Sequence, residues 1–362
     1  MLFSRIQFRK VLVVTAVLFA NLGTSCVKDK PGDTAKDVPK NLDARVFIAN
    51  EGSLGNGNAS LSVADLQTAE VYNDVFSSRN QQDLGDVFQS MLISQDQLFL
   101  AINNSDKIVV LDKTDYSLLH TIAVRKPRQM LLLSEDKMYV STMYYPEIQI
   151  VNPKTGSHLG TITTDFPTIE GMTYLNGKVY ACNWDTACNY LYEIDPQTDK
   201  IVGRIALPGS APQQVVADKE DKLWVLAGNY TKGKAASITR VDPVQRTILK
   251  QFHYEDADLI KPVWNAGKDT LYFLGVNYNH NAAVNGVYRM SIYDTQLPDQ
   301  MFIAAQPLQY FWALGYDTLR HQVYVGDPKG FIQRGRIHVY TTKGNELRNF
   351  DVGIGPGCFL FE

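Results

Sequence analysis

One unit recurs along nearly the whole chain, and it restricts the fold more than any other feature of the sequence. The unit consists of an apolar strand, a tight polar turn, a second strand, a variable loop, a third strand that ends near Asp or Asn, and a short closing strand. Clear third strands lie at residues 61–65, 109–112, 148–152, 191–195 and 238–242, and degenerate copies lie at 288–292 and 337–341. Their spacing of about 40 to 50 residues is the period of a four-stranded propeller blade. The sequence therefore predicts an all-β, seven-bladed β-propeller.

The two ends of the repeat region predict how the ring closes. The opening repeat begins at residues 45–48, and no first strand precedes it. The last repeat runs past its fourth strand, 346–352, into residues 355–361, which resemble the first strand of the earlier blades. We expect this C-terminal strand to complete the N-terminal blade, because a closed ring leaves no unpaired strand edge. The propeller is expected to span residues 44–362.

Residues 1–25 have the features of a targeting signal. Three basic residues precede an apolar stretch, 11–22, that is too short to span a bilayer comfortably, and small residues then lead to Cys26. The pattern predicts a lipoprotein signal, with Cys26 as the lipidated first residue of the mature protein. An ordinary secretory signal is the alternative, because Gly23 stands where lipoprotein signals usually have an aliphatic residue.

The segment after Cys26 predicts a tether and a location. Residues 26–43 are rich in Pro, Lys and Asp, a composition typical of a flexible linker. Residues 27–30 resemble the Lys-acidic signal that directs some lipoproteins to the outer face of a Gram-negative outer membrane. We therefore expect a lipid-anchored protein on the cell surface, attached to the outer membrane.

Charge and motifs exclude several classes of function. The net charge is −3, and the chain has no basic stripe, which argues against nucleic acid as a partner. The sequence contains no nucleophile elbow, zinc-protease motif, EF-hand loop or P-loop. The glycine-rich residues 52–57 join two strands, so we interpret them as a hairpin loop. We expect a protein that is not an enzyme and has no cofactor.

Three cysteines remain in the propeller region. Cys182 and Cys188 flank one loop and would stand at the facing ends of two paired strands, where an exported compartment would permit a disulfide. Two separate buried thiols are the alternative. Cys358, in the last strand, is expected to be a small core residue. No histidine stands at ligand spacing from these cysteines, so we expect no metal site.

The loops of the predicted repeat are asymmetric. The turns between first and second strands and between third and fourth strands are short and polar, and they share one face of the disc. The loops between second and third strands lie on the other face and are long and varied. Because binding sites usually occupy variable loops on a rigid scaffold, we expect the ligand on this second face.

These long loops are rich in aromatic and amide side chains. The aromatic residues that we expect to bind ligand are Tyr144, Tyr145, Trp184, Tyr230 and Tyr278. Such a surface suits a large ligand with little charge that carries amide or hydroxyl groups. The alternative is that several of these rings pack between adjacent blades. Residues near the starts of inner strands that are expected to reach the mouth of the central channel are Gln89, Arg128, Gln213 and Phe311.

Several short motifs carry a resemblance to a known family. They lie at residues 47–52, 58–62, 84–91, 150–155 and 352–357. On these motifs the chain, from about residue 44 to its end, resembles the exported YncE-like surface-layer propellers of Gram-negative gut bacteria. Within that family it is most similar to the surface lipoproteins that capture cobalamin (vitamin B12) and cap a TonB-dependent transporter.

The resemblance implies a function that fits the loop chemistry. It implies that the loop-bearing face captures cobalamin or a related corrinoid and passes this transported ligand to a TonB-dependent transporter in the outer membrane. Two other classes remain open. One is a surface module that binds glycans or another large nutrient and has no corrinoid affinity. The other is a propeller enzyme, for which the loop face would need converging acids, a histidine base or a metal.

Overall fold

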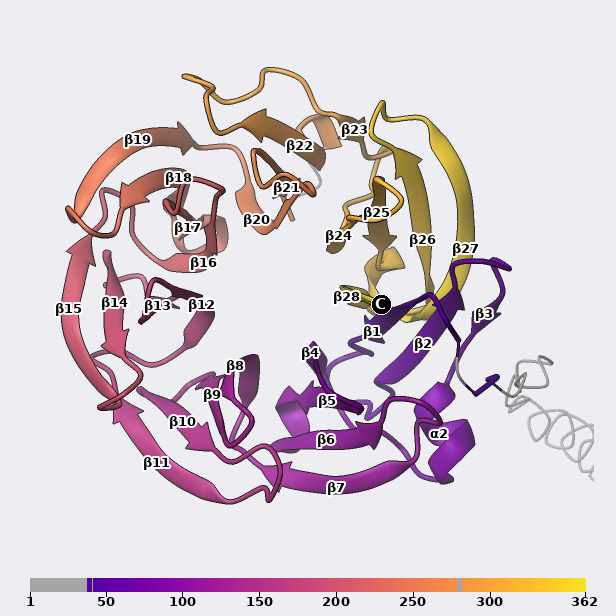
Figure 1. The fold of residues 1–362 in the computed structure, drawn as a ribbon. Helices are drawn as coiled ribbons and strands as arrows, with labels where there is room; N and C mark the ends of the chain where they lie inside the picture. Colours follow the sequence, from indigo (N-terminus) through magenta and orange to yellow (C-terminus); the bar gives the residue numbers. More distant parts are fainter. Residues whose placement is uncertain (1–37, 41, 279–281) are drawn as a thin grey trace, which may run out of the picture. The chain divides into compact units, whose positions relative to one another are not determined.

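The computed structural model describes residues 38–40, 42–278 and 282–362 and contains seven four-stranded antiparallel sheets arranged in a ring (Figure 1). The innermost strands of neighbouring sheets contact one another all the way round the ring. The predicted seven-bladed β-propeller is therefore confirmed. The predicted signal segment and Cys26 lie outside the described residues.

Each blade runs from an inner strand at the channel to an outer strand at the rim. Blades 1 to 3 contain β28 (Pro356–Phe361), β1 (Arg45–Asn50), β2 (Ser60–Asp65) and β3 (Val71–Tyr72); β4 (Phe88–Ser94), β5 (Gln97–Ile102), β6 (Lys107–Asp112) and β7 (Leu118–Ala123); and β8 (Pro127–Ser134), β9 (Lys137–Thr142), β10 (Glu147–Val151) and β11 (His158–Thr163). Blades 4 and 5 contain β12 (Ile169–Leu175), β13 (Lys178–Asn183), β14 (Tyr190–Asp195) and β15 (Lys200–Ala206); and β16 (Pro212–Ala217), β17 (Leu223–Asn229), β18 (Lys234–Asp242) and β19 (Thr247–Tyr254).

Blades 6 and 7 complete the ring. They contain β20 (Asp258–Trp264), β21 (Thr270–Val276), β22 (Gly286–Ser291) and β23 (Ile303–Ala304); and β24 (Ala313–Asp317), β25 (Gln322–Asp327), β26 (Arg334–Thr341) and β27 (Glu346–Ile354). The short helices in the connections are α2 (Val75–Asn80), η1 (Asn103–Ser105), η2 (Tyr230–Lys232), η3 (Ala282–Val284) and η4 (Lys329–Phe331).

The Asp or Asn that ends each clear third strand shapes the turn that follows it. The Asp112 side chain accepts hydrogen bonds from the backbone N–H groups of Thr114 and Asp115, at 2.7 and 3.3 Å. The same bonds recur at Asp65, Asn152 and Asp242. A short side-chain acceptor stabilises a turn in this way, so the repeated Asp or Asn marks the tight link to the outer strand.

Burial falls from the middle of each blade to its rim. The second strands are apolar and almost fully buried, as in β17, where all seven residues are buried. This follows because both faces of a blade pack against neighbouring blades. Leu223 and Val225 of β17 share an apolar cluster with blade 4, whereas Trp224 packs with Trp264 of blade 6. Outer strands such as β15 alternate between exposed and partly buried residues, as expected at a solvated edge.

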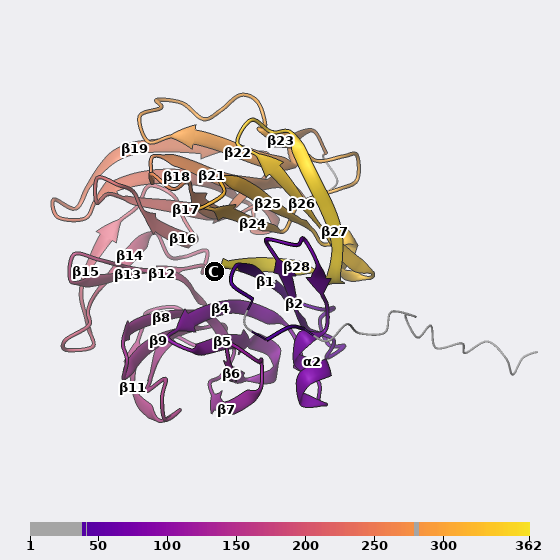
Figure 2. The same ribbon diagram turned by 45° about the vertical axis from the view of Figure 1, so that its right-hand side comes forward.

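Strand β28 closes the ring as the sequence predicts. It pairs antiparallel with β1, and Figures 1 and 2 show the two strands side by side. Arg45 and Glu362 exchange two backbone hydrogen bonds of 2.9 Å, and their side chains form an ion pair at 2.8 Å. Lys113 of blade 2 binds the same carboxylate at 2.6 Å. The inner edge of blade 1 is thereby filled by the end of the chain.

Gly335 provides a test of how tightly this closure is packed. A Cβ atom at Gly335 would lie 2.2 Å from Cδ of Pro356, the first residue of β28. Gly335→Ala is therefore expected to lower the free energy of unfolding by about 1–3 kcal/mol through overpacking. Guanidinium unfolding followed by circular dichroism measures the change. The control is Gly160→Ala, whose Cβ would meet Ile150 at an ordinary 3.7 Å. Equal midpoints for the two variants would contradict the expected close packing.

Candidate ligand site at the mouth of the central channel

The two faces of the ring carry different connections. One face, the turn face, bears the links between first and second strands and between third and fourth strands, which are short except for residues 292–302. The opposite face, the loop face, bears the links between second and third strands and the links between blades. Its longest described connections include 51–59, 73–87 and 305–312. Every inner strand begins at the loop face.

A strained junction recurs where the inner strands begin. The residue before five of these strands has positive φ: Val87 (61°), Lys126 (43°), Thr168 (68°), Ala211 (57°) and Gly355 (64°). In each case its carbonyl accepts a backbone hydrogen bond from the end of the second strand of the same blade. Left-handed backbone is costly for β-branched residues such as Val87 and Thr168, and strained residues of this kind cluster at functional sites. Here the surrounding fold holds the strained backbone at the channel mouth.

Six of the seven inner strands are bulged near the loop face. The bulges lie at Gln89 in β4, 128–129 in β8, 170–171 in β12, Gln213 in β16, 261–262 in β20 and Gly357 in β28. A β-bulge adds one residue, bends its strand and redirects a side chain. Five of the six contain a polar or charged residue. Together with two residues of adjoining loops, Glu51 and Trp312, the polar bulge residues form a set that we call the mouth ring: Glu51, Gln89, Arg128, Glu170, Gln213, Lys261 and Trp312.

Arg128 links three neighbouring blades within the mouth ring. Its Nε donates to both carboxylate oxygens of Glu170 at 2.9 Å, its Nη2 lies 2.9 Å from Oε1 of Glu170, and its Nη1 donates to the side-chain oxygen of Gln89. Glu170 is only 5% exposed. Burial raises the pKa of Glu170, and the positive charges of Arg128 and Lys261 oppose that rise. The pair is a fixed, charge-compensated unit.

The opposite side of the mouth ring is built around Gly357. Glu51 occupies the space beside this glycine, since a Cβ there would lie 2.2 Å from Glu51 Oε1. The Trp312 indole N–H donates to the same carboxylate oxygen at 2.7 Å. Lys261 donates to the Gly357 carbonyl at 2.9 Å, and its Nζ lies 5.6 Å from the Trp312 ring centroid. A loop acid, a strand cation and an indole are thus held together.

Trp312 also joins the mouth ring to a cluster of aromatic rings. Tyr278, predicted to bind ligand, has its ring centroid 6.3 Å from that of Trp312 and 6.2 Å from that of Tyr310. Phe331 of η4 lies 5.8 Å from Trp312 on edge-to-face geometry. Burial raises the pKa of Tyr278 well above its usual range. We call Tyr278, Tyr310, Trp312 and Phe331 the aromatic cluster.

The other predicted aromatic residues are distributed over the loops of three blades: Tyr144, Tyr145, Trp184 and Tyr230. Tyr144 is 65% exposed. Tyr145 lies under the Arg125 guanidinium, 4.3 Å from ring centroid to Cζ. Trp184 is half-buried, and its indole N–H donates to the Gly228 carbonyl of the next blade at 2.9 Å. Trp184 therefore helps join two blades, whereas Tyr144 presents a free ring.

Two sequence predictions involve buried side chains. Phe311 is 2% exposed and packs in the core between blades 6 and 7, so its ring does not line the channel mouth.

Cys182 and Cys188 are both buried and form no disulfide in the structure, which agrees with the alternative prediction of two separate thiols. Burial raises the pKa of both thiols. Cys358 is partly buried against the core of blades 1 and 2.

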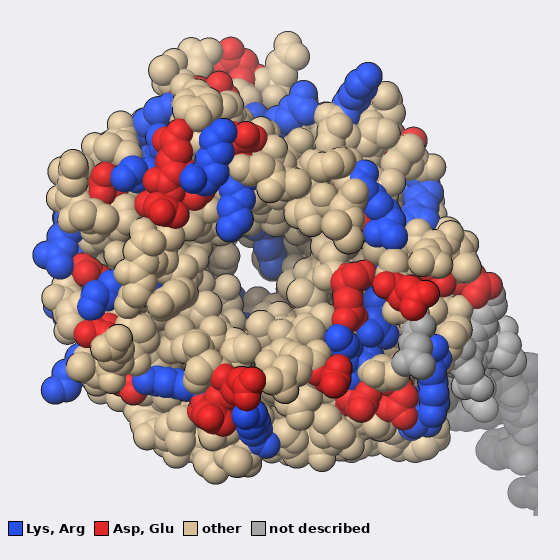
Figure 3. Space-filling view, in the orientation of Figure 1, with Lys and Arg blue, Asp and Glu red and all other residues tan. Residues whose placement is uncertain are grey.

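The ring is open at its centre. A space-filling view along the axis shows the opening with a basic side chain inside it, and charges of both signs around the surrounding face (Figure 3). Within the described residues, no group of three or more His, Cys, Asp and Glu side chains is placed to hold a metal ion. No helix in the same part of the chain is long and apolar enough to cross a membrane.

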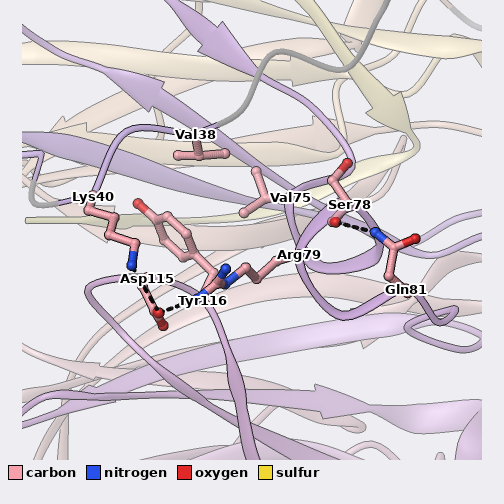
Figure 4. A pocket seen from close by; sticks show the side chains of 8 residues that line it. All are labelled: Val38, Lys40, Val75, Ser78, Arg79, Gln81, Asp115 and Tyr116. Atoms are coloured by element: carbon pink, nitrogen blue, oxygen red, sulfur yellow. Dashed lines mark hydrogen bonds and ion pairs between the residues drawn. The ribbon is translucent and has the colours of Figure 1, made fainter.

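A second concavity, of about 450 Å³, is lined in part by residues of α2 (Figure 4). Helix α2 lies outside the ring of strands (Figure 1). The lining of the concavity consists of Val38, Lys40, Val75, Ser78, Arg79, Gln81, Asp115 and Tyr116. Asp115 is ion-paired with Arg79 and lies 3.8 Å from the Lys40 ammonium. Hydrogen bonds from Ser117 and Arg79 lower the pKa of Asp115 to about 2. Of the residues that line the pocket, Lys40 and Arg79 are positive and Asp115 is negative, so its formal charge is +1.

Three residues of the mouth ring were predicted from the sequence to reach the channel mouth, and the others were not. Gln89 and Arg128 were predicted and lie together, and Gln213 occupies the equivalent bulge in blade 5. Glu51, Lys261 and Trp312 were not predicted as ligand residues. A usable signal exists in the inner strands, where a polar residue directly follows the first, buried residue, as in Pro127-Arg128, Ile169-Glu170 and Pro212-Gln213.

The buried Arg128–Glu170 pair predicts a pH-dependent loss of stability. Arg128→Met would leave the Glu170 carboxylate buried without its cation, at a cost of about 3–5 kcal/mol while it stays charged. The pKa of Glu170 would then rise further above its unfolded value, so stability is retained at low pH and lost as pH rises through the folded-state pKa. Urea unfolding should show a larger deficit at pH 8 than at pH 5. Adding Glu170→Gln should remove most of this pH dependence; a deficit that is equal at both pH values would contradict the assignment.

Comparison with known proteins places the chain among propellers. It is similar in structure to a quinonprotein alcohol dehydrogenase-like protein from Bacteroides thetaiotaomicron (TM-score 0.68, 16% identity, covering 88% of this chain and 78% of that one). It is also similar to AztD from Citrobacter koseri (0.57, 12%, 88% and 98%) and to hydrazine synthase from Kuenenia stuttgartiensis (0.56, 14%, 73% and 85%). These likenesses show the fold alone.

The sequence comparisons give the family. No curated protein matches the chain. A family model described as a domain of unknown function, DUF5074, matches residues 45–354, which is nearly the whole propeller. The chain therefore belongs to the DUF5074 family.

Proposed function

We propose that this protein captures a corrinoid such as cobalamin on its loop face, over the channel mouth, and delivers it to a TonB-dependent transporter. In this proposal the protein is attached to the outer membrane through lipidated Cys26, lies on the cell surface, and is a binding protein rather than an enzyme. The observation that carries the proposal is the mouth ring with its adjoining aromatic cluster. The resemblance of the chain to cobalamin-capturing surface lipoproteins supports the choice of ligand.

The charge and hydrogen-bonding groups of the mouth ring suit such a ligand. Its two cations, Arg128 and Lys261, balance its two carboxylates, Glu51 and Glu170, so the ring has no formal net charge when all four are ionised. Gln89 and Gln213 add neutral amide groups, which both donate and accept hydrogen bonds. A corrinoid presents a broad macrocycle edged with amides, and a few placed polar groups beside aromatic rings fix the orientation of a large ligand.

The site is also largely preformed. The bulged inner strands belong to the packed ring. Hydrogen bonds hold Arg128 to Glu170 and Trp312 to Glu51. Side chains that are already ordered lose little conformational freedom on binding, which favours tight capture. The exposed ring of Tyr144 extends this surface outward, and an aromatic ring supplies contact area at low entropic cost.

Calorimetric titration with cyanocobalamin tests the proposal on the full chain in detergent. We expect one-to-one binding that Tyr144→Ala weakens by roughly two- to tenfold through loss of aromatic contact. The combined Gln89→Ala/Gln213→Ala variant should bind more weakly still, because two amides of the mouth ring are lost. Tyr293→Ala is the matched control: this tyrosine is 59% exposed but lies on the turn face, so its variant should bind like the wild type.

Two results would argue against this function. Absence of any heat with cyanocobalamin would discard corrinoid capture and leave a glycan or another large nutrient as the ligand to be sought by screening. Equal losses for the Tyr144 and Tyr293 variants would keep the ligand but remove the loop face as its site.

A further inference from the structure

Lys261 is the cation of the mouth ring that forms no ion pair among the described residues. An ammonium group has three donors. Among the described residues, the Lys261 ammonium makes one hydrogen bond, to the Gly357 carbonyl, and it lies over the Trp312 ring. Arg128 differs, since it is ion-paired with the Glu170 carboxylate and each of its three side-chain nitrogens already contacts Glu170 or Gln89.

The carboxylates of the mouth ring are committed to other partners. Glu170 is bound to Arg128, and Glu51 accepts from the Trp312 indole. Lys261 acts on Glu170 only through space, by lowering its pKa against the effect of burial. Within the part of the chain that the structure describes, no carboxylate forms an ion pair with Lys261, and its side chain is partly exposed. A positive charge is therefore presented at the mouth.

The backbone holds Lys261 in place against its local preference. Its φ is 55°, in the left-handed region, although it lies within a strand and directly precedes Pro262. A residue before proline normally adopts extended backbone, and a side-chain-bearing residue pays for left-handed φ. The bulge at 261–262 is the equivalent of those that present Gln89, Arg128, Glu170 and Gln213. The strained backbone therefore lies at the same bulge that places the Lys261 cation in the mouth ring.

We propose that Lys261 binds an anionic oxygen of the ligand, of the phosphodiester class, above the channel mouth. A compact, strongly hydrated ammonium is suited to a phosphate oxygen, and the amides of Gln89 and Gln213 supply further neutral donors in the same ring. The inference rests on the proposed corrinoid function. Among corrinoids, cobalamin carries a phosphodiester in its nucleotide loop, whereas cobinamide has neither the loop nor the phosphate.

This difference between two ligands gives a direct experiment. The wild-type full chain and Lys261→Gln are each titrated with cyanocobalamin and with dicyanocobinamide. Loss of a charge-assisted hydrogen bond should weaken cyanocobalamin binding by roughly ten- to a hundredfold, with cobinamide binding changed by no more than about twofold. Lys232→Gln, an exposed lysine of η2 on the same face, is the control and should leave both affinities unchanged. Thermal unfolding of each variant verifies that the fold is intact.

The outcomes separate this inference from the proposed function. If Lys261→Gln lowers the affinity for both corrinoids equally, or for neither, Lys261 does not bind the phosphodiester. Corrinoid capture would still be supported by binding to the wild type. If the wild type binds neither corrinoid, the proposed function and this inference both fall. A loss confined to cyanocobalamin supports the phosphodiester contact.

Discussion

The structure depends on one constraint: each blade has two apolar faces, and both must be covered by neighbouring blades. The second strands are buried on both sides, so each blade is stable in water only when a neighbour covers each face, and only a closed ring covers them all. The pairing of β28 with β1 provides the closure, and Glu362 fixes it through Arg45 and Lys113. The same closure brings the beginnings of all inner strands around one opening.

The mouth ring shows how a repeated backbone can carry a site that is not repeated. A left-handed junction and a bulge recur from blade to blade, and each bulge presents one residue at the mouth. Changing only that residue gives an amide, a cation or a carboxylate at successive positions. Where the residue is Gly357, a side chain from a neighbouring loop, Glu51, fills the space. Affinity and selectivity can thus change at these positions while the packed blades remain the same.

Most of the fold and part of the site could be predicted from the sequence. The number of blades, the strand order and the closure by residues 356–361 all follow from the repeat. The period of the repeat and its apolar pattern are local properties of the chain, so both can be recognised in the sequence. Gln89, Arg128 and Gln213 could be assigned to the inner-strand starts for the same reason. Lys261 could not, because it is the fourth residue of β20, whereas Gln89, Arg128 and Gln213 are the second residues of their strands. The register mismatch that brings Lys261 to the equivalent place is not visible as a residue pattern. Phe311 lies near a strand start too, yet its ring turns into the core.

The sequence by itself determined the seven blades and the Asp- and Asn-capped turns, since each depends on hydrogen bonds and apolar contacts between residues close in the repeat. The closing strand could be identified as well, because it repeats the residue pattern of the other first strands, although its partner β1 lies at the far end of the chain. Only the tertiary structure decided which side chains share the channel mouth. Trp312 and Glu51, which share a hydrogen bond there, are 261 residues apart in the chain. Contacts at such separation form only when the ring is closed, and bulged strand register then decides which side chains face one another.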